Sequence, residues 1–296
     1  MEFGRVPTRQ LNKLDLSLPP DPLKNKRHLK GKAARSPGLY MGCAKWGRPE
    51  WVGTLYPAKT REKDFLSLYV KHYNAIELNA THYKLYDAEV TAKWAAQAKG
   101  SDCRFCPKMY KGISHFGNLS TKERMTLDFL RGTEGLGKHL GPIFIQLSDR
   151  FSPKRLDELI SYLEKLPATH EYFIEVRHPA WFETDGGEGL FNHLDRLKMG
   201  AVITDAAGRR DCVHMRLTTN KTFIRFVGNS LHKTDYQRCD EWIERLGNWY
   251  GRGLKETWFF MHMHDEARSP RLTQYFAEQV NKYLPLKLQE PLNTAR

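Results

Sequence analysis

Two opposite charges inside one short apolar run, Glu175 and Arg177, are the residues of this 296-residue chain best placed to do chemistry. The run 173–177 is rich in β-branched and aromatic residues, which predicts a buried strand. Side chains alternate between the two faces of a strand, so the two charges share one face. Burying them is costly unless they pair or face a polar cavity. Because Pro179 ends the run, the pattern is typical of a strand that carries polar groups to an active site.

Eight strand-like runs alternate with helical patterns from residue 37 onward. The clearest helical pattern begins at Ser152, a natural N-cap, with Pro153 at the first helical position. Repeated β-then-α units predict a parallel sheet with right-handed crossovers, and eight of them predict an α/β fold of the (β/α)8 TIM-barrel type. The alternative is an open doubly wound sheet, which usually carries a Gly-rich phosphate turn that residues 42–47 lack. The expected strands are 39–45, 75–81, 104–109, 142–147, 172–177, 200–205, 222–227 and 257–264.

In such a barrel the active site lies at the carboxyl ends of the strands. The polar positions of each run therefore give a set of side chains that we expect to meet in one charged bowl. In chain order, these candidates are Trp46, Glu77, Asn79, Lys108, Gln146, Glu175, Arg177, His178, Asp205, Arg225, His262 and His264.

Three cations among these candidates accompany three carboxylates, and this combination has two interpretations. In the first, the charges form a structural ion network that fills the barrel. In the second, Lys108, Arg177 and Arg225 bind an anionic substrate, because guanidinium groups suit phosphate or carboxylate. Glu175, Asp205 and His178 would then act as catalytic acid–base groups. The remaining predicted substrate contacts are Glu77, Asn79, Gln146 and Trp46.

A metal site is a further hypothesis for the last strand. His262 and His264 share one strand face, and with Asp205 and Glu175 they would offer nitrogen and oxygen ligands to a divalent metal. Such an ion would activate water or polarise an oxygen. The alternative is a pair of neutral, hydrogen-bonded histidines.

Charge and composition set the expected partners and location. The chain carries 47 Lys and Arg against 34 Asp and Glu, a net charge of +13. Residues 1–36 combine basic residues with several prolines, which predicts a mobile basic arm before a barrel at 37–285 and a tail at 286–296. The arm would either attract nucleic acid or another polyanion, or serve as a solubilising tail. The chain has no apolar run long enough to span a membrane, no secretory signal and few cysteines, so we expect a cytoplasmic protein.

Four ordered motifs resemble the YecE-like family, also called domain of unknown function 72. Residues 175–182 (EVRHPAWF) resemble its most diagnostic stretch, and residues 138–147 (KHLGPIFIQL) resemble its KLGP…QLP segment. Residues 77–83 (ELNATHY) and 42–56 are similar to its second-strand and first-strand motifs. The chain departs from the family at Ser148-Asp149, where Pro-Pro is usual, and at 261–265, where an aromatic-Asn-Asn segment is usual. The resemblance covers about residues 38–284 and implies a TIM barrel, but no reaction.

We therefore expect an enzyme, a hydrolase or isomerase that acts on an anionic, phosphorylated or phosphodiester substrate by acid–base or metal-assisted chemistry. The alternative is a non-catalytic nucleic-acid-binding protein that uses the arm and the charged rim. The fold analogy behind the first hypothesis is associational, because one fold hosts many activities.

Overall fold

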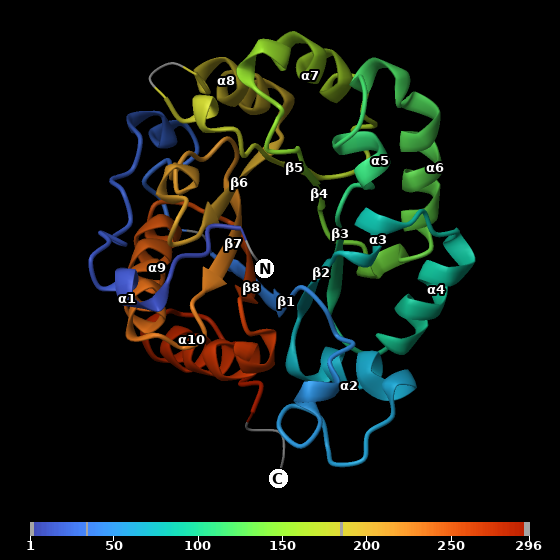
Figure 1. Cartoon of the computed structure of the whole chain (residues 1–296), viewed down its shortest axis with the longest axis vertical. Helices are drawn as coiled ribbons and strands as arrows, with labels where there is room; N and C mark the ends of the chain where they lie inside the picture. The colour runs from blue at the N-terminus through green and yellow to red at the C-terminus, as the bar shows by residue number, and fades with distance from the viewer. Residues whose placement is uncertain (1–2, 34, 184–185, 293–296) are drawn as a thin grey trace.

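Parallel strands form the centre of the molecule in the computed structural model, which describes residues 3–33, 35–183 and 186–292. Six strands make one hydrogen-bonded sheet in the order β1-β8-β7-β6-β5-β4, and β2 pairs with β3. The described strands surround a common centre with helices outside them (Figure 1). The fold is thus mixed α/β with a curled parallel sheet, and each predicted strand run overlaps one strand. These are β1 (Gly38–Cys43), β2 (Ala75–Leu78), β3 (Arg104–Pro107), β4 (Ile143–Gln146), β5 (Tyr172–Glu175), β6 (Gly200–Asp205), β7 (Lys221–Gly228) and β8 (Glu256–Met263).

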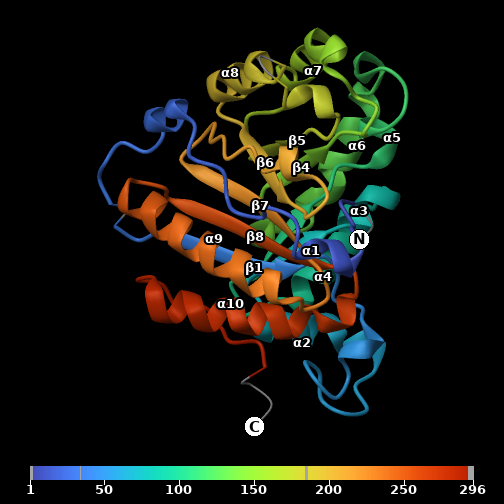
Figure 2. The same cartoon turned by 60° about the vertical axis from the view of Figure 1, so that its left-hand side comes forward.

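The longer helices alternate with the strands along the chain and cover the outer face of the sheet (Figures 1 and 2). The helix expected from Ser152 begins as a 3-10 turn, and α7 starts only at Leu156. The α-helices are α1 (Thr8–Leu11), α2 (Phe65–His72), α3 (Ala80–Tyr83), α4 (Ala88–Gln97), α5 (Lys111–Ser114), α6 (Glu123–Glu134), α7 (Leu156–Leu163), α8 (Glu188–Leu197), α9 (Lys233–Gly251) and α10 (Ser269–Tyr283). The 3-10 helices are η1 (Leu23–Arg27), η2 (Pro49–Trp51), η3 (Glu62–Asp64), η4 (Leu119–Thr121), η5 (Gly137–His139), η6 (Pro153–Arg155), η7 (Pro179–Trp181), η8 (Arg210–Cys212) and η9 (Glu266–Arg268).

Two apolar layers fix the strands. One lies between the sheet and the outer helices, where for example Phe259 of β8 stacks on Phe276 of α10 at 4.3 Å. The other fills the inside of the curled sheet, where Phe223 contacts the rings of Phe144, Phe173 and Phe260 at 4.9 to 5.4 Å. Because strand side chains repeat every two residues, the residues two positions beyond this aromatic layer also point inward.

The amino-terminal arm lies along α8 and α9 (Figure 2). Asp21 accepts hydrogen bonds from Arg245, Trp249 and Arg252 at 2.8 to 3.0 Å. The fully buried Asn25 side chain donates to the Met215 carbonyl at 2.8 Å. The sequence predicts a mobile arm, whereas these contacts describe a packed one. Its mobility in solution stays a prediction, which hydrogen exchange would measure.

Within the described ranges, none of the helices combines the length and the apolar character that a membrane crossing requires.

Candidate active site

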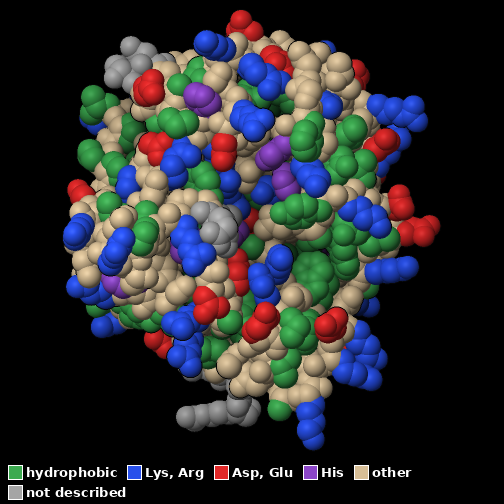
Figure 3. All heavy atoms as spheres, in the orientation of Figure 1, with side chains coloured by type: hydrophobic (Ala, Val, Ile, Leu, Met, Phe, Trp, Pro, Cys, Tyr) green, Lys and Arg blue, Asp and Glu red, His purple; other side chains and the backbone are tan. Residues whose placement is uncertain are grey.

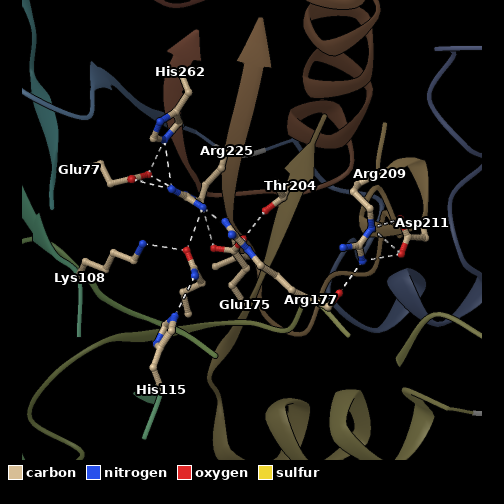
Figure 4. A network of polar contacts seen from close by, with 12 residues as sticks. Glu77, Lys108, His115, Glu175, Arg177, Thr204, Arg209, Asp211, Arg225 and His262 are labelled. Carbon is tan, nitrogen blue, oxygen red and sulfur yellow. Dashed lines mark hydrogen bonds and ion pairs between the residues drawn. The ribbon is translucent and has the colours of Figure 1, made fainter. Parts of the chain in front are cut away.

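Arg225 of β7 is the centre of a buried ion network inside the curled sheet (Figure 4). Its Nε and Nη2 atoms each donate to Glu77 of β2 at 2.8 Å. Its Nη1 atom donates to both oxygens of Glu175 of β5, at 2.9 and 3.2 Å. The three side chains are at most 1% exposed. Arg225 is therefore saturated by two carboxylates, which favours the structural interpretation of this residue over substrate binding.

Three further side chains complete the pairing of these carboxylates. His262 Nε2 lies 2.9 Å from Glu77 Oε2. Thr204 Oγ1 and Arg177 Nε donate to Glu175 Oε1 at 2.9 and 2.7 Å. Burial alone would raise the pKa of Glu175, but the charges of Arg177 and Arg225 outweigh it and lower this pKa to about 2.

The pKa of Glu77 is set by the same balance. Burial opposes the charged form, but Arg225 and then His262 lower the pKa of Glu77 well below its ordinary value. At neutral pH both carboxylates are thus anions with their oxygens occupied. They are poor candidates for proton transfer to a substrate, and the catalytic role predicted for Glu175 stays a prediction.

Lys108 follows β3 immediately. Its hydrogen-bond partner is uncharged, whereas Arg177 and Arg225 pair with carboxylates. Its amine is buried, with the residue 7% exposed, and donates to the neutral amide oxygen of Gln146 at 2.8 Å. In the described part of the chain, no carboxylate forms an ion pair with it. Burial, followed by the charge of Arg225, lowers the pKa of Lys108 to about 7. A large share of this amine is therefore neutral at physiological pH, in the form that can accept a proton.

Two histidines that the sequence reasoning missed lie beside this lysine. The rings of His82 and His115 are 4.9 Å apart, and His115 Nε2 is 3.5 Å from the Gln146 side-chain nitrogen. Burial and then the Lys108 charge lower the pKa of His82 to about 3 and that of His115 to about 4. Both follow strand ends, where the two-residue period that selected the other candidates no longer applies. Only the order of elements, β2 to α3 and β3 to α5, could have drawn attention to them.

A cleft of about 490 Å³, called the mouth cleft here, opens above Lys108 between the segments that follow β1, β2 and β8. Lys, Arg and His side chains gather near the centre of this face (Figure 3). Asn79 and His264 both line the cleft. The Asn79 side chain donates to Glu77 at 2.8 Å. A larger hollow of about 690 Å³ lies between α6 and α7, away from the network. The mouth cleft is lined by Ala44, Lys45, Arg48, Glu50, Asn79, Tyr83, Lys108, Arg225, His262, His264, Asp265, Glu266 and Ala267.

Asp205 does not join the other candidates, so its predicted position is wrong. Its carboxylate accepts from Trp242 Nε1 at 2.7 Å and Arg238 Nη1 at 3.3 Å, both on α9, and also from Arg210. The physical reason is strand alternation. Thr204 faces inward toward Glu175, and so Asp205, the next residue, faces outward under α9.

Two loop residues also lie apart from the network. Trp46 packs edge-on against Trp94 and Phe105, with ring centroids 5.7 and 6.5 Å away. His178 caps η7 by accepting from the Ala180 N–H at 3.2 Å. Both side chains therefore have local packing or capping functions in this arrangement.

The metal hypothesis finds no fitting ligand set among the described residues. They contain no group of three or more His, Cys, Asp and Glu side chains that could hold a metal ion. The Nε2 atom of His262 is already engaged by Glu77 and lies 3.4 Å from Arg225 Nη2. A guanidinium at this distance would repel a cation, so we assign no metal-dependent step to this site.

Comparison with known proteins places the chain among proteins of similar sequence and fold. Residues 40–294 match the family model described as "Protein of unknown function DUF72". The UPF0759 protein YecE of Escherichia coli K12 is 30% identical over 266 residues, covering 83% of this chain and 94% of the relative. The UPF0759 protein YunF of Bacillus subtilis is 24% identical over 209 residues, covering 65% of this chain and 71% of the relative.

Two solved structures share the fold. A DUF72 family protein from Enterococcus faecalis V583 superposes with a TM-score of 0.66 at 17% identity, covering 84% of this chain and 99% of its own. A DUF72 family protein from Thermotoga maritima MSB8 gives a TM-score of 0.60 at 18% identity, covering 82% and 99%. The match over most of the length, together with the ordered motifs and the curled parallel sheet, shows that the chain belongs to the DUF72 family.

Proposed function

We propose that this protein is an enzyme that acts on a small anionic molecule by acid–base chemistry, with the Lys108 amine as the group that exchanges a proton with the substrate. The observation that carries the proposal is the partner of Lys108. A buried ammonium costs several kcal/mol unless an anion compensates it. Here the partner is the neutral amide of Gln146. A protein that keeps such an amine at the floor of an open cleft holds it ready for a ligand.

An anionic substrate would supply the carboxylate or phosphate that Lys108 lacks. The lining of the same cleft combines Lys45 and Arg48 with the carboxylates of Glu50, Asp265 and Glu266. Arg48 pairs with Glu266 at 3.8 Å, so the preference for an anion rests on Lys108. The volume of about 490 Å³ lies within the range of small-molecule sites, roughly 300–1,000 Å³. Glu77, Glu175 and Arg225 would act as a rigid floor that fixes Gln146 and Lys108, without exchanging protons themselves.

The proposal predicts a proton change on binding. An anion beside Lys108 favours the ammonium form, so the pKa of Lys108 rises from about 7 and the protein takes up a proton. Calorimetry with inorganic phosphate as the probe, at pH 8 in two buffers of different ionisation enthalpy, measures this uptake directly. Lys108→Met should abolish the uptake and weaken binding. Lys93→Met is the matched control, because it removes the same charge from an exposed position of α4.

Turnover provides the second test. A panel of phosphorylated sugars and phosphodiesters, followed by phosphate release and by chromatographic separation of isomerised products, should identify a substrate whose conversion Lys108→Met abolishes. If no anion binds at the mouth cleft, the proposal fails. Binding of single-stranded DNA that is steeply salt-dependent and insensitive to Lys108→Met would instead support the nucleic-acid-binding alternative.

We also infer that the curled sheet closes into an eight-stranded (β/α)8 barrel. Across the β1–β2 seam, the Asn74 side chain accepts from the Met41 N–H at 2.7 Å and donates to the Leu39 carbonyl at 2.9 Å. The Tyr69 hydroxyl accepts from Cys43 N at 2.7 Å and donates to the Ala75 carbonyl at 2.9 Å. Side chains thus take the place of a backbone ladder at this seam.

The β3–β4 seam is bridged by backbone bonds. The Gly141 N–H donates to the Phe105 carbonyl at 2.7 Å, and the Met109 N–H donates to the Phe144 carbonyl at 2.9 Å. A closed barrel has no free sheet edge between these strands. Slow exchange of the amide hydrogens of Met41 and Cys43, measured by NMR, is the expected result, and exchange as fast as in a loop would contradict closure.

A further inference from the structure

Phe3, in the amino-terminal arm, lies over a cation of the candidate site. Its ring centroid is 3.9 Å from the guanidinium carbon of Arg177 and 5.0 Å from that of Arg209. Both arginines belong to segments that follow strands, Arg177 after β5 and Arg209 after β6. The arm therefore reaches the carboxyl ends of the strands, although it begins the chain and runs outside α8 and α9 before β1 (Figure 1).

The backbone beside Phe3 fits closely against the segment that follows β6. The Gly208 N–H donates to the Gly4 carbonyl at 2.8 Å. Gly4 has a φ of +67°, and a Cβ on it would lie 2.6 Å from that of Ala206. Both facts require glycine at this position. The place of Phe3 is thus fixed by its neighbour in the chain.

The next part of the arm is anchored as well. Leu11 and Leu16 are buried with Ala207 in a small apolar cluster, against which Val6 packs. The Arg210 Nη2 atom donates to the Leu16 and Ser17 carbonyls at 2.9 Å each. These contacts hold the arm on the side of the mouth formed by β5 and β6, whereas the mouth cleft opens beside β1, β2 and β8.

Arg177 is the group that this arrangement covers. It is 7% exposed, its Nε atom donates to Glu175, and its Nη2 atom is buried without a hydrogen-bond partner in the described structure. Without the Phe3 ring, one face of this guanidinium would lose its cover. A guanidinium with an unused donor at a mouth is a group that binds phosphate.

We infer that Phe3 is a specificity-determining residue, which covers Arg177 and restricts the site to molecules small enough for the mouth cleft. The inference rests on the proposed function for the chemistry of the site, an anion-binding mouth. It adds that the arm, which precedes the family match at 40–294, makes this chain a small-molecule binder and excludes polymeric anions such as nucleic acid. Its physical basis is steric cover together with a cation–π contact, which strengthens when the cation is desolvated.

Chemical modification of arginine tests whether the Phe3 ring shields Arg177, and it requires no knowledge of the substrate. The full chain is treated with phenylglyoxal, and the rate at each arginine is followed by peptide mass spectrometry. Arg177 should be protected in the parent protein, and Phe3→Ala should raise its rate about tenfold, as expected for loss of one desolvated cation–π contact. The rate at Arg131, on the exposed face of α6, should stay unchanged. Phe116→Ala, which removes a 60% exposed ring elsewhere, is the control variant.

Binding of anions of two sizes tests the specificity. Phe3→Ala should bind a phosphorylated oligonucleotide of ten thymidines at least tenfold more tightly than the parent does, with little change for inorganic phosphate. Equal rates at Arg177 in the parent and in Phe3→Ala, or unchanged oligonucleotide binding, would overturn the inference. The two failures are distinguishable. If Lys108 has an ordinary pKa while Phe3 still protects Arg177 from modification, the proposed function is refuted and the inference about Phe3 is not.

Discussion

Replacement of Arg225 by methionine is the perturbation whose cost follows most directly from the structure. The side chain makes four hydrogen bonds to Glu77 and Glu175, all between groups that are at most 1% exposed. Arg225→Met keeps the apolar stem but leaves two buried carboxylates without their shared partner. Breaking a buried ion pair from one side costs about 3–5 kcal/mol. Against a typical total stability of about 5–15 kcal/mol, this loss is large.

Urea unfolding at pH 7 measures this cost. We expect Arg225→Met to lower the free energy of unfolding by about 3–5 kcal/mol, and the double change Arg225→Met with Glu77→Gln to recover part of it, because one stranded charge is removed. Arg131→Met, at an exposed position of α6, should change stability by about 0.5 kcal/mol or less. A loss of under about 1 kcal/mol for Arg225→Met would refute the structural role and return Arg225 to the candidate substrate-binding groups.

Three further substitutions test other parts of the structure. In Lys108→Met, stability relative to the parent should depend on pH. The folded parent has a pKa of about 7 at Lys108 and the unfolded chain about 10.4, so the unfolded state holds more protons between these values. The parent should therefore gain stability over Lys108→Met as pH rises from 7 to 10, and urea titrations that give a constant difference would contradict the shift. Asp205→Asn should lower stability by about 2–4 kcal/mol while phosphate binding is unchanged, because its partners lie on α9; loss of binding in a folded variant would restore its predicted role. Asn74→Ala should lower the melting temperature and speed amide exchange at Met41, and unchanged exchange would argue against a side-chain bridge between β1 and β2.

The strands and part of the network followed from the two-residue period of the sequence. Glu77, Gln146, Glu175, Arg225 and His262 each lie two positions beyond an interior residue, so their parity correctly predicted that they point inward. Pairing could not be predicted in the same way. Saturation of Arg225 depends on distances between strands, and no periodic pattern in one strand contains them.

The predicted inward direction of a side chain was wrong where the two-residue strand period ends, or where this period was counted from the wrong residue. Asp205 is the last residue of β6, and its outward direction follows only from the inward neighbour Thr204. Trp46 and His178 follow their strands, where local packing and capping decide the direction of a side chain. The contacts of the arm had no local signal, because Asp21 binds residues more than 220 positions away.

The central claim is that Lys108 is a buried amine kept near neutrality at the floor of the mouth cleft. Titration of the lysine side-chain amines by NMR, with the Lys108 signal assigned from Lys108→Arg, measures the pKa directly. The account predicts a pKa near 7, which rises when phosphate is added. A Lys108 pKa at the ordinary lysine value of about 10.4, unmoved by phosphate, would contradict it.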